Sequence, residues 1–208
     1  QCMVKIKVAF CGICGTDIHI FHGNMDKRVD IPQIIGHEVS GEVVEVANDV
    51  TNVNVGDRVA VRPLLPGAAD PSDNGQLHIG KHLKFIGIDT PGGMQSYWNV
   101  PAFTLHKLPF GMPLHIGALI EPLAVACHDV RRSNVQEGEN VVFLGGGPIG
   151  VLIALVAKHK KANVLLSEPN AGRIEKCRSL GIKTINPAEQ HLVNEVEAFT
   201  KGAMADVV

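Results

Sequence analysis

The apolar run Val141–Leu144, which leads directly into the glycine turn Gly145–Gly150, constrains the fold more than any other segment. A strand that enters a glycine-rich turn and then a helix is typical of a parallel sheet wound with helices. The turn fits the pattern G-x-G-x-x-G, in which glycines let a pyrophosphate approach a helix N-terminus. We therefore predict a dinucleotide site, the alternative being a tight turn without a ligand. Its expected cofactor-binding residues are Gly145, Gly147, Pro148, Ile149 and Gly150.

The second expected strand, Asn163–Ser167, ends at an acidic residue, Glu168. A carboxylate about 20 residues after the glycine turn can accept hydrogen bonds from ribose hydroxyls and repel a 2′-phosphate. Glu168 therefore favours NAD over NADP. Arg173 keeps NADP open as an alternative, because its guanidinium could meet a phosphate instead.

The periodicity changes between the two halves of the chain. Residues 1–124 contain short alternating apolar and polar runs with turn signals between them, which predict a compact β barrel. The expected strands are 4–8, 39–46 and 95–100, and 54–61 is expected to be a turn followed by a strand. A helix over 116–130, interrupted by Pro122, follows. Residues 125–208 then alternate strands and helices, which predicts a doubly wound parallel sheet; further helices are expected at 150–160, 171–180 and 188–200, and a strand at 183–185. Residues 206–208 read as the opening of a further strand, so we expect an interior piece of a longer protein.

Composition excludes several classes of partner. A net charge of −2 and no long basic run among the 208 residues disfavour nucleic acid and membrane surfaces. No apolar run approaches the ~20 residues needed to span a bilayer. Five irregularly spaced cysteines do not form a disulfide framework and indicate a reducing, cytoplasmic setting.

A candidate metal site combines two separate segments. Cys14 follows a break at Gly12, and His37 and Glu38 follow Gly36. Thiolate and imidazole are preferred zinc ligands, and three protein ligands with an open position characterise catalytic zinc. Glu121 lies in an otherwise apolar stretch, where a buried carboxylate needs a partner such as a metal. Each of these residues could alternatively be structural.

Several neighbours of these residues could serve the chemistry. Cys14 is preferred over Cys11 as the ligand, because Asp17 follows it and could accept a hydrogen bond from His37. Thr16 and His19 could relay a proton from the site to solvent, with His22 a weaker candidate. Glu38 could bind the metal or its bound water. Ordinary surface positions are the alternative for both histidines.

These motifs together resemble the zinc-dependent medium-chain dehydrogenase/reductase family, in particular sorbitol (polyol) dehydrogenases and their sugar-acid and threonine dehydrogenase relatives. The resemblance rests, in family order, on Cys14–His19, Gly36–Glu38, Val55–Val59, Glu121–Leu123 and Gly145–Gly150. It implies a GroES-like barrel catalytic domain over 1–124 and a Rossmann NAD(P)-binding domain over 125–208, each partial. It also implies zinc bound by Cys14, His37 and Glu38, with Glu121 a direct or water-mediated ligand and Thr16 the relay hydroxyl.

One departure from the family pattern concerns the segment Pro63–Leu83. Many members carry four cysteines there that hold a structural zinc, whereas this segment contains none. We therefore expect one catalytic zinc and no structural zinc. In the family this segment often contributes to subunit contacts, so a homo-oligomer, dimer or tetramer, is expected with its size open.

The leading hypothesis is a zinc enzyme that transfers a hydride from a secondary alcohol of a polyol or sugar acid to NAD. Thr16, His19 and Glu38 are its expected catalytic residues. A threonine 3-dehydrogenase-like enzyme is the nearest alternative, although groups for an ammonium and a carboxylate cannot be assigned. A nucleotide-binding relative without catalysis is the alternative from another class.

Overall fold

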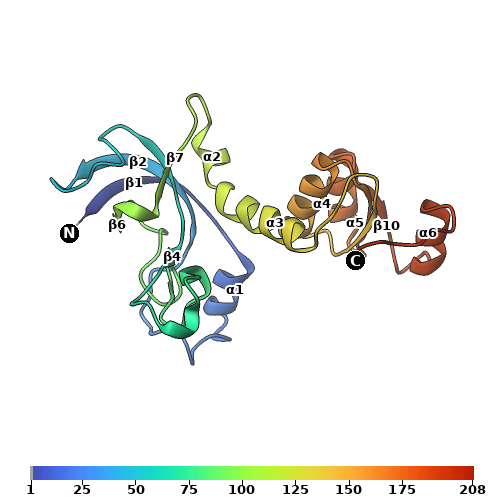
Figure 1. Ribbon diagram of the computed structural model, residues 1–208, viewed down its shortest axis with the longest axis horizontal. Helices are drawn as coiled ribbons and strands as arrows, with labels where there is room; N and C mark the ends of the chain where they lie inside the picture. The colour runs from blue at the N-terminus through green and yellow to red at the C-terminus, as the bar shows by residue number, and fades with distance from the viewer. Residues whose placement is uncertain (1) are drawn as a thin grey trace. The chain divides into compact units, whose positions relative to one another are not determined.

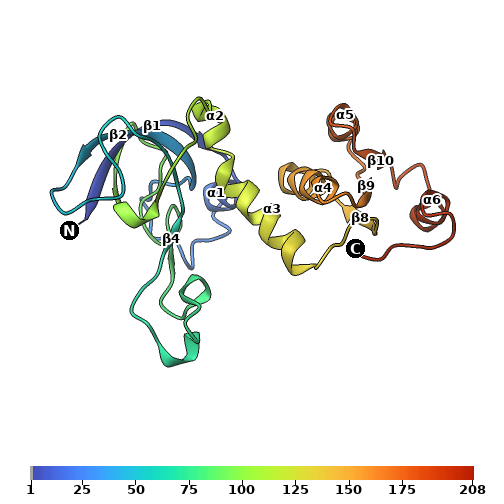
Figure 2. The same cartoon turned by 45° about the horizontal axis from the view of Figure 1, so that its top comes forward.

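A computed structural model describes residues 2–208 (Figures 1 and 2). The chain divides into two compact units, Gln1–Glu121 (unit 1) and Pro122–Val208 (unit 2). The division falls within helix α3 (Ile120–Arg132), close to the boundary expected between residues 124 and 125.

Unit 1 is built on an antiparallel sheet with the strand order β6-β1-β2-β3-β7. Its strands are β1 (Met3–Gly12), β2 (Glu38–Val46), β3 (Arg58–Val61), β6 (Tyr97–Pro101) and β7 (Leu105–Lys107). The alternation of apolar and polar residues places one side of each strand in a valine-rich core that includes Val4, Ile6, Val39, Val43 and Trp98. Across residues 2–121 no pairing joins β6 to β7, so the expected barrel takes the form of a sheet with two open edges.

Short elements complete unit 1. They are α1 (Gly15–Phe21), β4 (Leu64–Leu65), β5 (Lys84–Phe85), α2 (Leu114–Gly117) and the 3₁₀ turns η1 (Pro71–Asp73), η2 (Leu77–Ile79) and η3 (Ala102–Thr104). The helix expected over 116–130 is in fact α2 followed by α3. The break lies before α3 rather than at Pro122, which is in the first turn of α3, where a missing N–H costs nothing.

Unit 2 contains a parallel sheet with the order β10-β9-β8. Its strands are β8 (Asn140–Leu144), β9 (Asn163–Ser167) and β10 (Lys183–Ile185), and its further helices are α4 (Pro148–His159), α5 (Ala171–Ser179) and α6 (Leu192–Phe199). Alternate strand residues face two apolar clusters: Val141 packs with α4 and α5, whereas Val142 packs with α6. Helix α6 is shorter than expected because Asn186 closes a turn before it, accepting a hydrogen bond from the Ala188 N–H at 3.0 Å.

The last residues return to the other side of β8. Val207 forms a parallel bridge with Val141, and the Val142 N–H donates to the Val207 carbonyl oxygen at 3.0 Å. This reversal of strand order is the one that a doubly wound sheet makes. Up to Val208 the structure shows three strands and this bridge, fewer than the about six of a Rossmann domain. The expected Rossmann domain is therefore not present as a whole in this chain.

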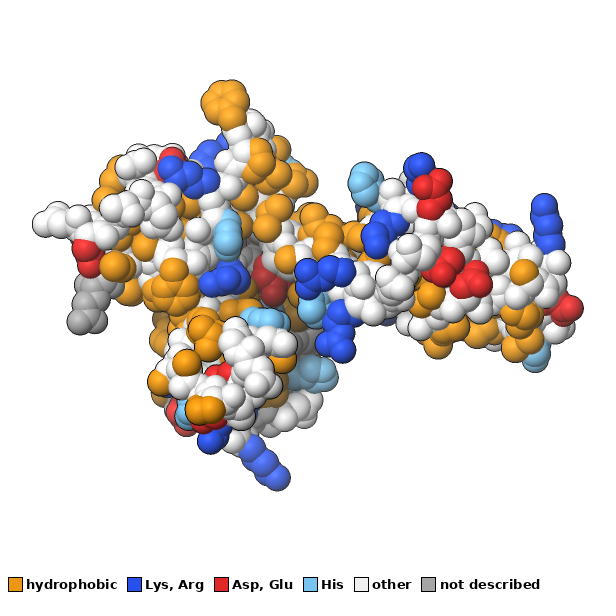
Figure 3. Space-filling view, viewed as in Figure 1, with side chains coloured by type: hydrophobic (Ala, Val, Ile, Leu, Met, Phe, Trp, Pro, Cys, Tyr) orange, Lys and Arg blue, Asp and Glu red, His pale blue; other side chains and the backbone are white. Residues whose placement is uncertain are grey.

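Charges of both signs are interspersed over the face shown in Figure 3. No helix among residues 2–208 is long and apolar enough to cross a membrane.

Candidate metal centre and glycine turn

Cys14 stands between the end of β1 and the start of α1. It is the N-cap of α1, in an extended conformation with φ −83° and ψ 158°. Its N–H donates to the Asp17 carboxylate Oδ2 at 2.8 Å, and the Asp17 N–H donates to the Cys14 carbonyl oxygen at 3.1 Å. These two hydrogen bonds fix the turn that presents the thiol.

His37 and Glu38 stand at the start of β2, next to the end of β1. Gly12 pairs directly with Glu38 across the two strands. A Cβ at Gly12 would lie 2.0 Å from the Glu38 Oε2, so only glycine leaves room for this carboxylate. The pairing of β1 with β2 thus brings the two ligand-bearing segments together.

Asp17 ties these segments to each other. It is 2% exposed, and its Oδ1 accepts a hydrogen bond from the Gly36 N–H at 3.0 Å while its Oδ2 accepts the one from Cys14. One buried carboxylate therefore holds the backbone beside both His37 and Cys14. The sequence pattern suggested a different role, a hydrogen bond to the imidazole.

That expected hydrogen bond is not formed. The His37 Nδ1 lies 3.9 Å from the Asp17 Oδ1, too far for a hydrogen bond. Within residues 2–208, this buried nitrogen has no hydrogen-bond partner. No hydrogen bond from these residues to Nδ1 therefore fixes the orientation of this imidazole.

The side chains of Cys14, His37 and Glu38 form the one group of potential metal ligands found in residues 2–208, with ligand atoms within 4.8 Å of one another. Burial lowers the pKa of His37, which keeps the imidazole neutral, as metal binding requires. Burial, and then the Asp17 charge, raise the pKa of Glu38. The sulfur, nitrogen and oxygen donors match the ligand types of catalytic zinc.

Glu121, the fourth expected ligand, lies outside this group. Burial raises the pKa of its carboxyl group to about 7, and the charge of Glu38 adds to the effect. The two carboxylates are thus close enough to repel, although direct ligation by Glu121 stays a prediction.

Burial of this carboxyl group, together with the Glu38 charge, makes the stability of the metal-free protein depend on Glu121. The folded-state pKa of about 7 lies above the ordinary 4.5, so the folded state binds more protons between these values and loses stability as the pH rises through them. We expect Glu121→Gln to raise the Tm of chelator-treated protein at about pH 8 and to give a smaller gain at about pH 5. Scanning fluorimetry checks this. The exposed Glu42→Gln serves as control, and an equal gain from it, or a gain largest in acid, would contradict the prediction.

Thr16 lies in the first turn of α1 and His19 in its last. The Thr16 Oγ1 is 3.7 Å from the Cys14 Sγ, so the hydroxyl is at the metal centre. His19 is exposed, with its Nδ1 3.4 Å from the Asn24 Nδ2. The relay from Thr16 to His19 has no hydrogen bond in the structure and stays a prediction, and His22 is exposed next to them.

The glycine turn lies between β8 and α4, as the pattern predicts. Gly147 is the N-cap of α4 and Pro148 its first residue, so the helix N-terminus points at the turn. Gly145 has φ +107°, a value that side-chain-bearing residues rarely adopt. The turn borders an open cleft of about 390 Å³, lined by Phe143, Leu144, Gly145, Gly147, Pro148, Ile149, Gly150 and Ile153.

Glu168 is more enclosed than the sequence suggests. It is 2% exposed, and its oxygens accept hydrogen bonds from the Gly146 N–H at 2.7 Å and the Asn170 N–H at 2.8 Å. The Asn170 N–H, followed by that of Gly146 and by Arg173, holds the pKa of Glu168 below its usual range despite burial. Arg173 lies 3.7 Å from the same carboxylate. Glu168 therefore organises the glycine turn, and a role in ribose binding would use its remaining lone pairs.

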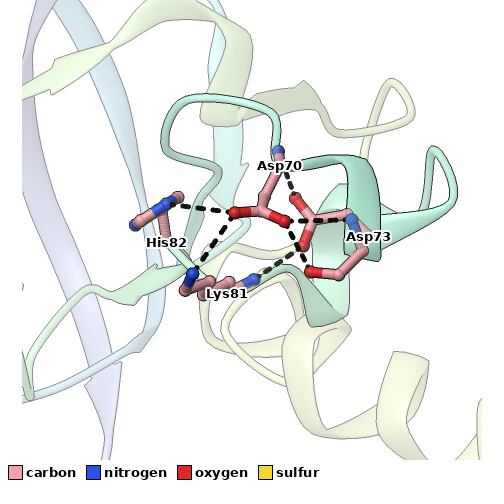
Figure 4. Close-up of polar contacts among 5 residues, drawn as sticks. Asp70, Asp73, Lys81 and His82 are labelled. Carbon is pink, nitrogen blue, oxygen red and sulfur yellow. Dashed lines mark hydrogen bonds and ion pairs between the residues drawn. The ribbon is translucent and has the colours of Figure 1, made fainter.

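The segment Pro63–Leu83, here called the lobe, extends away from the sheet of unit 1 (Figure 2). Two carboxylates organise it (Figure 4). The Asp73 oxygens accept hydrogen bonds from the N–H groups of Lys81 and Asp70, each at 2.9 Å, and Asp70 accepts one from the Ser72 hydroxyl at 2.6 Å. Lys81 and His82 lie 3.4 and 3.9 Å from Asp70.

Asp73 is the residue on which this network depends, because it accepts hydrogen bonds from the backbone of two separate positions in the lobe, Asp70 and Lys81. We expect Asp73→Ala to speed protease cleavage within the lobe several-fold while changing global stability by at most about 1 kcal/mol. Lys81→Gln removes only an exposed ion pair and should leave the cleavage rate unchanged. Limited proteolysis with mass spectrometry checks both, and slow cleavage of Asp73→Ala would show that other contacts hold the lobe.

Comparisons with known proteins agree with this architecture. Residues 2–110 match the family model "Alcohol dehydrogenase GroES-like domain". The chain is 54% identical over 206 residues to a 2-dehydro-3-deoxy-L-galactonate 5-dehydrogenase of Pseudoalteromonas atlantica, covering 99% of this chain and 60% of that protein. It is 39% identical over 209 residues to an L-threonine 3-dehydrogenase of Pyrococcus horikoshii, covering 98% and 60%.

A solved structure described as a zinc-binding dehydrogenase of Sinorhizobium meliloti, bound to NADP, superposes with a TM-score of 0.87 at 33% identity. The match covers 93% of this chain and 57% of that one. The chain thus spans about 60% of the length of the curated relatives it matches. With a GroES-like match over more than half of its residues, the chain belongs to the medium-chain dehydrogenase/reductase family of zinc-type alcohol dehydrogenases.

Proposed function

We propose that this chain is the metal-binding part of a zinc-dependent dehydrogenase that transfers a hydride from a secondary alcohol to NAD(P). The observation that carries the proposal is the group Cys14, His37 and Glu38, whose ligand atoms lie within 4.8 Å of one another around a buried imidazole. The glycine turn of unit 2 supports the cofactor half of the proposal, since it offers a helix N-terminus to a pyrophosphate.

The residues present fit zinc. They supply one thiol, one buried imidazole and one carboxylate, which are donor types of catalytic zinc. Bound zinc would supply Lewis-acid polarisation of the alcohol oxygen. Cys14, His37 and Glu38 would hold it, and Asp17 would keep their backbone segments in register. Glu121 would provide a further carboxylate beside Glu38.

The remaining site residues would handle the proton and the cofactor. Thr16, half-buried beside Cys14, would accept the proton of the alcohol while donating its own hydroxyl proton to the exposed His19, and His19 would release a proton to solvent. Glu168 would favour NAD through its remaining lone pairs, and Arg173 would accommodate NADP if it left its ion pair.

A polyol or sugar acid is the proposed substrate class. The relative named as a 2-dehydro-3-deoxy-L-galactonate 5-dehydrogenase supports a sugar acid. The relative named as an L-threonine 3-dehydrogenase makes an amino-alcohol the second candidate. A cytoplasmic homo-oligomer, dimer or tetramer, completes the proposal; all five cysteines are free, in keeping with a reducing setting.

The test is an assay of the full-length protein that contains this chain. Reduction of NAD and NADP is followed with sugar acids, polyols and threonine, before and after treatment with a zinc chelator. A rate on a sugar acid or polyol that the chelator removes and zinc restores would support the proposal. A rate on threonine alone would favour the second candidate, and no rate from protein shown to bind zinc would refute both.

A further inference from the structure

We infer that the ion pair between Arg28 and Asp89 positions the metal ligand His37, and that it does so through the aromatic ring of Phe85. The inference rests on the proposed metal centre. It concerns residues that are not metal ligands themselves and lie outside the glycine turn.

The imidazole of His37 has an aromatic neighbour where a hydrogen bond would be usual. A metal-ligating histidine usually donates its second ring N–H to a carboxylate or carbonyl group, which fixes the ring. No such bond reaches the Nδ1 of His37 within the described part of the chain. The ring of Phe85 instead meets it edge to face, with ring centroids 5.3 Å apart and planes at 81°. Phe85 therefore limits how the imidazole can turn.

Phe85 is itself held by a short turn that Asp89 closes. The Phe85 N–H donates to the Asp89 Oδ2 at 2.8 Å, and the Asp89 N–H donates to the Phe85 carbonyl oxygen at 2.8 Å. The Ile88 N–H donates to the same carbonyl oxygen at 3.2 Å. A change at Asp89 would therefore be transmitted to the backbone that carries the Phe85 ring.

Arg28 fixes this carboxylate from a distant part of the chain. Its Nε donates to the Asp89 Oδ1 at 2.9 Å and its Nη2 to the Asp89 Oδ2 at 2.8 Å, the two-bond geometry that orients a carboxylate best. These hydrogen bonds hold the pKa of Asp89 below its usual range, so the pair stays charged. The Asp89 side chain is only 20% exposed, which limits screening by solvent.

A small apolar cluster makes the link rigid. The buried side chains of Ile20, Val29 and Ile88 pack together, with Phe85 and Ile35 against them. Arg28 precedes Val29, and Asp89 follows Ile88, so both ends of the ion pair are anchored in this cluster. An unbroken series of contacts therefore runs from Arg28 through Asp89 and Phe85 to His37.

The test measures metal affinity and metal geometry in the full chain rather than turnover. Asp89→Asn and Arg28→Gln are each loaded with zinc, for chelator competition, and with cobalt(II), whose visible spectrum reports ligand geometry. We expect each variant to bind zinc about tenfold more weakly, because mutating residues that orient a metal ligand typically costs at least this much affinity. We also expect the visible spectrum of the bound cobalt(II) to shift. Arg28→Lys, which keeps the charge but not the fork, should recover part of the affinity.

Asp57→Asn is the matched control. Asp57 pairs with Lys107 at 2.7 Å, is 27% exposed and accepts a hydrogen bond from the Asn54 N–H, but is not part of this chain of contacts. Equal loss of zinc affinity in Asp57→Asn and Asp89→Asn would overturn the inference, as would an unchanged cobalt spectrum in Phe85→Leu. Wild-type protein that binds neither metal would instead refute the proposed metal centre.

Discussion

Replacing Cys14 with serine is expected to abolish zinc binding while leaving the fold intact. The sulfur is the one soft donor of the group Cys14, His37 and Glu38, and the hydroxyl of serine stays protonated at neutral pH. The backbone hydrogen bonds between residue 14 and Asp17 do not involve the sulfur, so the turn should persist. The loss of affinity should exceed the 10- to 100-fold that changes around a metal site usually cause. Metal content by mass spectrometry and circular dichroism together check this.

Cys11→Ser is the matched control, since both cysteines lie within one short segment. Cys11 is half-buried against the valine core, outside the ligand group, and burial raises the pKa of its thiol to about 11. We expect this variant to keep its zinc and to lose about 1–3 kcal/mol of stability, because a hydroxyl replaces a thiol in apolar surroundings. Zinc retained by Cys14→Ser, or lost from Cys11→Ser, would show that the preferred ligand was chosen wrongly.

The local order of strands, turns and helices could be predicted because the signals lie within short windows. The alternation in 39–46 predicts β2, and the strand followed by glycines predicts β8, the turn and α4. The interruption predicted at Pro122 was misplaced: the break lies between α2 and α3, and Pro122 is in the first turn of α3. Proline is excluded from helix interiors but not from a first turn, and sequence alone did not locate that turn. Whether the sheet of unit 1 closes into a barrel depends on pairing between strands far apart in the sequence. The alternation of apolar and polar residues within a strand does not show which strands pair.

The candidate site was predictable in its chemistry but not in its supporting contacts. Cys14, His37 and Glu38 can be recognised in the sequence as potential metal ligands, because their residue types carry suitable donor atoms. Phe85 does not, because an aromatic residue far along the chain gives no sign that its ring will meet an imidazole. Glu168 was predicted to bind ribose, and that role stays a prediction. Its bond to the Gly146 N–H was not predicted, because it depends on how closely the turn approaches β9, which only the fold determines.

Two substitutions in the glycine turn should separate cofactor binding from folding. A Cβ added at Gly147 meets no atom of the chain within 4 Å, and its φ of −69° suits any residue. Gly147→Ala should therefore fold normally. The added methyl group would occupy space beside the helix N-terminus, where a pyrophosphate would approach, so we expect NAD affinity to fall at least tenfold. Calorimetric titration of the zinc-loaded full-length protein with NAD measures this.

Gly150→Ala should fail for the opposite reason. A Cβ at Gly150 would lie 2.1 Å from the Gly145 carbonyl oxygen, a backbone atom that cannot move aside without changing the φ of +107° at Gly145. Because α4 and β8 share the apolar core of unit 2, we expect a destabilisation of about 1–3 kcal/mol, measured by urea unfolding. Gly172→Ala, whose Cβ would approach only the Asn170 side chain at 3.5 Å, is the control and should be neutral or stabilising. If Gly147→Ala lost stability while Gly150→Ala kept it, the turn would be built for packing rather than for a dinucleotide.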